Sequence, residues 1–123
     1  MAKHTRKEIG MRGEELAEQH LLARGYAIRH KNWRSGHGEL DIVAQRESVI
    51  VFVEVRARTG DAFGSPEETI TPRKKAKLME TAQAYLREHD LEDATCRVDV
   101  IAIEFDHQLR VTRLAHIEDA IEN

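Results

Sequence analysis

Three acidic residues stand in segments that otherwise have the composition of buried β-strands. Glu39 and Asp41 lie in ELDIVAQ, and Glu54, followed two residues later by Arg56, lies in SVIVFVEVRAR. A buried carboxylate is costly unless a metal ion, a basic side chain or hydrogen-bond donors compensate its charge. Mg²⁺ takes oxygen ligands and polarises phosphoryl oxygens, and an adjacent basic group stabilises charge that develops on phosphate. One interpretation is therefore a metal-dependent site for phosphate chemistry.

An ion-pair network is the other interpretation of these residues. Glu54 could pair with Arg58 or Arg34, and Asp41 with Arg56, at a partly solvated end of the sheet. Residues two apart on a strand share a face, and the strands of a hairpin lie about 5 Å apart. Both interpretations require the charged groups of the two strands to converge, so the spacing alone leaves both open.

The rest of the chain predicts an α/β protein with a central mixed sheet of four to five strands flanked by helices. Apolar residues recur every three or four positions over 8–24 and over 71–89, which indicates two helices. Gly25 is expected to end the first helix, and Thr71 to cap the second with Pro72 at its first position. Alternating or continuous apolar runs predict strands at 26–34, 39–45, 48–58 and 97–105, with an edge strand at 109–114. A short helix or a tail is expected over 116–123.

The strand 48–58 has two different faces. One face carries only valines up to Val55, whereas the other begins with Ile50 and Phe52 and turns charged from Glu54 onward. A central strand covered on both sides, with a charged end on one side, follows from this pattern. Asp99 lies on the predicted strand 97–105, beside Arg97, and this placement suggests a structural pair.

Length and charge limit the classes of function. A chain of 123 residues suits one domain, spanning 1–123, with residues 1–7 as a flexible basic arm. No apolar run approaches the roughly 20 residues that span a bilayer, so we expect a cytoplasmic protein without membrane contact. The formal net charge of -3 gives no overall attraction to nucleic acid, so any such binding depends on local clusters.

One basic cluster stands at the start of the second predicted helix. The segment RKKAK places cations where they oppose the helix dipole, and this cost favours phosphate binding over a plain solvated face. With two arginines nearer the carboxylates, the expected nucleic-acid-binding residues are Arg34, Arg58, Arg73, Lys74, Lys75 and Lys77.

The chain resembles a known family over roughly residues 10–105. The combination of G-E-x-x-A, N-W-R, G-E-x-D, F-V-E-V, F-G-x-P and R-x-D-V strongly resembles the YraN-like bacterial proteins. That family belongs to the restriction-endonuclease-like, or PD-(D/E)XK, superfamily, which includes archaeal Holliday-junction resolvases. The resemblance implies a restriction-endonuclease-like core and a nuclease-like domain.

Site residues follow from the resemblance position by position. Asp41 and Glu54 match the superfamily's metal-binding acidic residues, and Glu14 matches a further carboxylate on the first helix of resolvases. Glu39 belongs to the G-E-x-D signature and is grouped with these metal ligands. Arg56 departs from the pattern, because the superfamily has lysine there. Arginine stays charged and cannot act as a general base, so its expected catalytic role is electrostatic.

These implications lead to three hypotheses of different classes. The first is an endonuclease dependent on Mg²⁺ or Mn²⁺ that acts on structured or branched DNA, with Asp41, Glu54 and Arg56 as catalytic residues. A homodimer is compatible with this, because a junction has two-fold symmetry. The second is a catalytically inactive nucleic-acid-binding module, which the arginine favours. The third is a protein–protein adaptor, for which no salt-dependent DNA affinity is expected.

Overall fold

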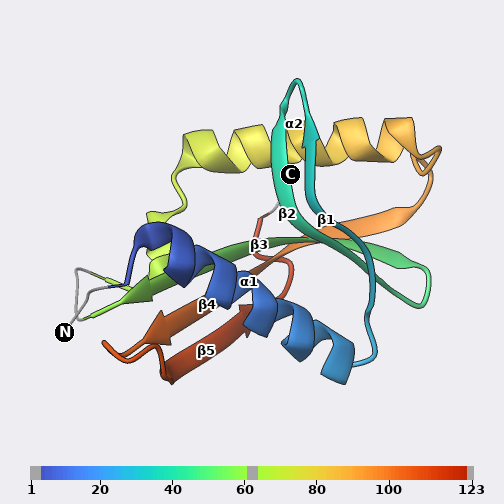
Figure 1. The fold of residues 1–123 in the computed structure, drawn as a ribbon. Coiled ribbons are helices and arrows are strands. Elements are labelled where there is room, and N and C mark those ends of the chain that lie inside the picture. The colour runs from blue at the N-terminus through green and yellow to red at the C-terminus, as the bar shows by residue number, and fades with distance from the viewer. Residues whose placement is uncertain (1–3, 61–63, 122–123) are drawn as a thin grey trace.

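Five strands form one mixed sheet whose spatial order follows the order of the chain (Figure 1). The computed structural model describes residues 4–60 and 64–121. Every neighbouring pair is antiparallel except the third and fourth strands, which are parallel. The strands are β1 (Ala27–Ser35), β2 (Gly38–Arg46), β3 (Val49–Thr59), β4 (Thr95–Phe105) and β5 (Val111–Ile117). This confirms the predicted α/β class and mixed sheet.

Two helices, α1 (Arg6–Ala23) and α2 (Pro72–Glu88), cover opposite faces of the sheet. A short 3₁₀ turn, η1 (Pro66–Thr69), precedes α2. Val51 and Val53 on β3 pack with α1, whereas Ile50 and Phe52 pack with α2. The alternation expected for a central strand is therefore confirmed, and the charged end of β3 belongs to the face that α2 covers.

The helix termini follow the expected capping chemistry. Thr5 caps α1 in a reciprocal capping box with Glu8, and the helix begins at Arg6. Arg6 and Lys7 therefore belong to α1 instead of a flexible arm, and residues 1–3 lie outside the described residues. Gly25 follows α1 with φ of 85°, a conformation that glycine adopts without strain.

The second helix starts as its sequence predicts. The Thr71 hydroxyl accepts a hydrogen bond from the backbone N–H of Lys74, and Pro72 occupies the first helical turn. Three of the first six positions of α2 are lysines, and no acidic residue stands in its first turn. The basic cluster is thus presented at the helix N-terminus.

Gly13 allows α1 to approach β3 closely. A Cβ atom at this position would lie 2.6 Å from the Cβ of Ala57 and 3.7 Å from Cγ1 of Val55. The first of these distances is shorter than side-chain carbons tolerate, so only glycine fits without a shift of the helix. The next residue, Glu14, is consequently held close to the charged end of β3.

The C-terminal segment differs from the expected helix or tail. Residues His116 and Ile117 complete β5, and 118–121 form a turn and a bend. The backbone N–H of Ala120 donates to the Val98 carbonyl at 2.8 Å, and Ile121 is buried against the α2 side of the core. Pairing with β4 explains the difference, because it satisfies the backbone groups that a terminal helix would have satisfied internally.

Among the described residues, no helix has both the length and the apolar character needed to cross a membrane.

Candidate active site

The sheet splits between β2 and β3 at the end where the acidic residues lie. Pairing of the two strands extends from Arg46↔Val49 to Ile42↔Val53, whereas β3 continues to pair with β4 as far as Thr59. Figure 1 shows the β1–β2 hairpin standing away from β3 beyond this point. Asp41 is the first residue past the split. Its Oδ2 accepts a hydrogen bond from the Val55 backbone N–H at 2.9 Å and so takes the place of a strand partner.

Three carboxylates line one cavity on the α1 side of the split. The cavity has a volume of about 330 Å³, and Glu14 from α1 meets Glu39 and Asp41 from β2 there. Burial raises the pKa of Glu14, and the negative charges of Asp41 and Glu39 raise it further. These three carboxylates are thus brought together, and their mutual repulsion favours a cation or a proton among them.

Asn32 joins two of these carboxylates. In the orientation that satisfies both ends of its amide, its nitrogen donates to Oε1 of Glu14 at 3.0 Å and to Oε1 of Glu39 at 3.1 Å. The residue lies opposite Asp41, between the paired positions Lys31↔Ile42 and Trp33↔Leu40, and its φ is 51°. Asparagine tolerates this left-handed backbone better than most residues, so backbone shape and carboxylate bridging both suit it.

Glu54 on β3 does not line this cavity, but it lies close enough to Asp41 to share a hydrogen bond with it. Burial, a hydrogen bond with Asp41 and the negative charge of Asp41 raise its pKa to about 9, although the positive charges of Arg56 and Lys74 oppose this. The arginine also forms an ion pair with it, with 3.0 Å between Nη2 and Oε2. The raised pKa means that Glu54 binds a proton more readily than an ordinary carboxylate, and a cation bound beside Asp41 would displace that proton.

The ion pairs differ from those of the predicted network. Glu54 pairs with its own neighbour Arg56. Arg34 lies 3.3 Å from Glu39 at an exposed position, and Arg58 lies 3.9 Å from Glu104 on β4. Side chains two apart on β3 lie closer than the expected cross-strand partners because the split has moved β2 away. Arg58 is consequently directed towards β4.

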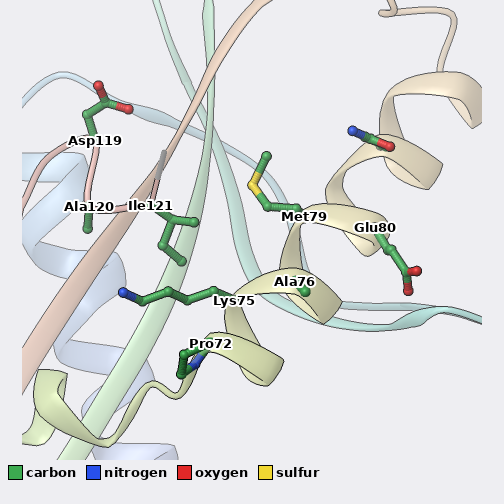
Figure 2. A pocket seen from close by; sticks show the side chains of 9 residues that line it. Pro72, Lys75, Ala76, Met79, Glu80, Asp119, Ala120 and Ile121 are labelled. Atoms are coloured by element: carbon green, nitrogen blue, oxygen red, sulfur yellow. The ribbon is translucent and has the colours of Figure 1, made fainter. Parts of the chain in front are cut away.

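The basic residues of α2 divide between two sides of the helix. Lys74 is close enough to Glu54 to lower its pKa, and the Lys77 side chain packs against the hairpin turn at Gly38. Lys75 instead lines a groove between α2 and the C-terminal turn, as Figure 2 shows beside Ala120 and Ile121. Arg73 is exposed. Only part of the cluster therefore lies beside the carboxylates.

The donor set suits a hard divalent cation. The carboxylates at the split offer oxygen atoms only, and Mg²⁺ or Mn²⁺ binds through one or two carboxylates with further waters. Within the described residues, the buried Nε of Arg56 has no hydrogen-bond partner. A buried donor without an acceptor beside an acidic cluster is the arrangement expected where a phosphate oxygen completes the site.

Two contributors to this cavity were not found by the sequence reasoning. Asn32 is part of the N-W-R motif, but its bridging role accompanies a left-handed backbone conformation within β1. Lys7 also lines the cavity, because α1 starts early enough to include it. The capping box of Thr5 and Glu8 was the sequence signal that could have placed Lys7 in the helix.

Comparisons with known proteins agree with the motif pattern. A family model described as "Uncharacterised protein family UPF0102" matches residues 13–103. A UPF0102 protein of Pelotomaculum thermopropionicum is 47% identical over 116 residues, which cover 94% of this chain and 97% of that one. UPF0102 proteins of Dehalococcoides mccartyi and Mycobacterium avium are 44% and 40% identical, over 82% and 93% of this chain and 84% and 90% of theirs.

Proposed function

The chain belongs to the protein family UPF0102, and for this member we propose a divalent-metal-dependent DNA endonuclease of the restriction-endonuclease-like superfamily. The observation that supports this most is the position of Asp41 at the split between β2 and β3, where it lines one cavity with Glu14 and Glu39 and also interacts with Glu54. In most proteins, four acidic residues would be distributed over the solvated surface. Their concentration beside a buried, unpaired arginine donor favours metal and phosphate binding.

Each residue has a distinct part in this proposal. Asp41 and Glu54 would hold Mg²⁺ or Mn²⁺, with Glu14 and Glu39 assisting. The bound metal would polarise a phosphoryl oxygen and lower the pKa of a bound water. Arg56 would donate to the scissile phosphate and stabilise its developing negative charge. Its guanidinium is held 3.0 Å from Glu54, so its position beside the metal ligands is fixed before substrate binds.

The nucleic acid would lie along the end of the sheet where the hairpin approaches α2. Lys74, Lys77 and the exposed Arg34 surround this end and would contact backbone phosphates. Structured or branched DNA is the proposed substrate, by the resemblance to resolvases, and a homodimer would match the two-fold symmetry of a junction.

A nucleic-acid-binding module without catalysis is the second candidate. The observation that favours it is the Arg56 side chain, which is ion-paired with Glu54 where the superfamily has lysine. A guanidinium cannot accept a proton, so water activation would depend entirely on the metal. Such a module would bind DNA in chelator and never cut it.

The deciding experiment is calorimetric titration of Mg²⁺ and Mn²⁺, with and without branched DNA, together with cleavage assays in the same buffers. We expect saturable binding and cleavage by the wild type, and loss of both in Asp41→Ala. Asp93→Ala is the matched control, because Asp93 is an exposed aspartate in the turn before β4. Absence of metal binding to the wild type, both alone and with DNA, would overturn the nuclease. Binding of DNA with unchanged affinity in chelator, and no cleavage, would establish the second candidate.

A further inference from the structure

A second group of titratable side chains lies at the opposite end of α1 from the carboxylates. An open hollow of about 850 Å³ is surrounded by His20 of α1, Arg24 at its C-cap, Arg46 at the end of β2, and His116 and Glu118 of the β5 region. None of these residues takes part in the proposed nuclease site. The hollow is separated from Glu14 by about 10 Å along the helix, at a rise of about 1.5 Å per residue.

A chain of hydrogen bonds that begins at the buried Asp99 fixes the orientation of the two histidines of this hollow. Asp99 is fully buried, and its Oδ2 lies 2.8 Å from Nε2 of His116. Nδ1 of His116 in turn lies 3.1 Å from Nε2 of His20. A carboxylate acceptor behind His116 makes its Nε2 the protonated nitrogen, so its Nδ1 accepts and the His20 ring donates to it. The His20 ring therefore stands at the hollow in one orientation.

Both arginines of the hollow present charge without a carboxylate partner. Within residues 4–60 and 64–121, neither Arg24 nor Arg46 has an acidic group within ion-pair distance. The Arg46 guanidinium lies 4.6 Å from the centre of the Tyr26 ring, which restricts its position. The one acidic residue of the hollow, Glu118, lies 3.6 Å from Arg97. Positive charge thus exceeds negative charge around the hollow.

A cation site is the competing assignment for these side chains. Ligand atoms of Asp99, His116 and Glu118 lie within 4.8 Å of one another, which is a suitable spacing for a metal. However, Arg97 lies 2.9 Å from Asp99 and occupies the space between that carboxylate and Glu118. Burial lowers the pKa of His20, and the positive charge of Arg24 lowers it further. Three guanidinium groups around two imidazoles oppose a cation and favour an anion.

We propose that the hollow lined by His20, Arg24 and Arg46 binds a phosphate group, either a free phosphate or the phosphate of a nucleotide chain. Arginine presents paired N–H donors that match phosphate oxygens. The two guanidinium groups would donate to its oxygens from the C-cap of α1 and from the end of β2, and the His20 ring would line the hollow between them. The proposal does not rest on nuclease activity, because it uses no residue of the carboxylate site.

The test is a titration of the intact chain with sodium phosphate in EDTA at constant ionic strength, followed by NMR of the imidazole groups. We expect saturable shifts of His20 and His116, and none of the exposed His107. Arg24→Gln and Arg46→Gln should each weaken binding about tenfold, the loss of one charge-assisted hydrogen bond. Arg87→Gln is the matched control, because Arg87 is an exposed arginine in the last turn of α2.

Two further titrations, with a 5′-phosphorylated oligonucleotide and with Zn²⁺, identify the ligand. Tighter binding of a 5′-phosphorylated oligonucleotide than of inorganic phosphate would assign the site to nucleic acid, and equal binding would assign it to free phosphate. Linear, unsaturable shifts, or equal affinities in all three variants, would overturn the site. Saturation of both imidazoles by Zn²⁺ but not by phosphate would overturn it in favour of a cation site. Because EDTA removes divalent metal from the phosphate titrations, their outcome is independent of the nuclease test.

Discussion

Glu54 and Asp99 are both acidic residues on neighbouring parallel strands, but their surroundings are opposite. Asp99 is completely buried and receives hydrogen bonds from Arg97, His116 and the backbone N–H of Asp119. Burial opposes its ionisation, yet these donors outweigh the burial and lower its pKa. Glu54 is less buried but faces another carboxylate, and its pKa is raised.

The difference shows that burial alone does not mark a functional carboxylate. Asp99 has at least one strong donor for each oxygen, so its charge is fully used within the protein. Glu54 has one ion pair with Arg56 and a like-charged neighbour in Asp41. A carboxylate whose charge the protein does not compensate is available to an external cation, whereas a compensated one is structural.

The largest effect on stability should come from removing the charge of Asp99, the carboxylate that the protein compensates. Asp99→Asn removes the charge that Arg97 and His116 face, and we expect it to destabilise the protein by about 3 kcal/mol, as for loss of one partner of a buried ion pair. Urea unfolding at pH 7 measures this. The control Glu118→Gln removes the exposed partner of Arg97 and should change stability by less than about 0.5 kcal/mol. Equal losses in the two variants would contradict the contrast.

The pH dependence of stability should have opposite signs at the two residues. Because the folded state raises the pKa of Glu54 from 4.5 to about 9, it binds the proton more tightly than the unfolded chain, and stability falls as pH rises through this range. For Asp99, whose pKa is lowered, stability is lost as pH falls below its usual value of 3.8. Unfolding of wild type and Glu54→Gln in EDTA at pH 5, 7 and 9 should give a flatter profile for the variant. Parallel profiles would show that Glu54 is ordinarily ionised.

A substitution at Gly13 should disturb the cavity that Glu14 lines and leave the surroundings of Asp99 unchanged. Gly13→Ala places a methyl group against Ala57, and we expect a loss of about 1–2 kcal/mol together with weaker metal binding, because Glu14 moves with the helix. Gly10→Ala is the matched control on the same helix. It meets no atom within 4 Å and should stabilise the protein by about 0.5 kcal/mol. If Gly13→Ala were as stable as Gly10→Ala, the close approach of α1 would not be required.

Arg56→Lys should have the smallest effect on stability. Lysine keeps the positive charge beside Glu54 and removes the unpaired buried Nε, so we expect a change within about 0.5 kcal/mol. Under the proposed function, cleavage should remain within a few-fold of wild type, whereas Arg56→Gln should lower it about 100-fold. A large gain of activity in Arg56→Lys would show that a proton-accepting side chain, and not charge alone, is needed there.

The sequence contained most of the fold because its strong signals are local. The alternation in β3, the cap at Thr71 and the glycine after α1 each depend on adjacent residues, and each is confirmed. The end of the chain was less predictable. His116 and Ile117 extend β5 only because β4 offers them a partner, and pairing between distant segments has no local signature.

The candidate site was predictable in its members and less so in its geometry. The G-E-x-x-A, G-E-x-D and F-V-E-V motifs contain the carboxylates that lie at or beside the split. The split between β2 and β3 was not apparent, since a hairpin predicts continuous pairing. For the same reason, Arg58 lies near Glu104 and not at the site. The bridging role of Asn32 accompanies a left-handed backbone within β1, which residue type alone does not specify. Departures from regular pairing are set by packing on both faces of the sheet, which residue types alone do not specify.

The chain-ordered sheet also has a consequence for how the protein folds. Strands β1 to β3 can pair as a local meander, but β4 joins β3 only after the segment 60–94 has closed into a long loop. Loop closure of this length carries an entropic cost before any contact rewards it. Because β4 pairs along the whole of β3, including Glu54, the late-joining strand also completes the surroundings of the carboxylates. The burial of Glu54 should therefore be completed in the slowest topological step of folding, after the meander that carries Glu39, Asp41 and Glu54 has paired.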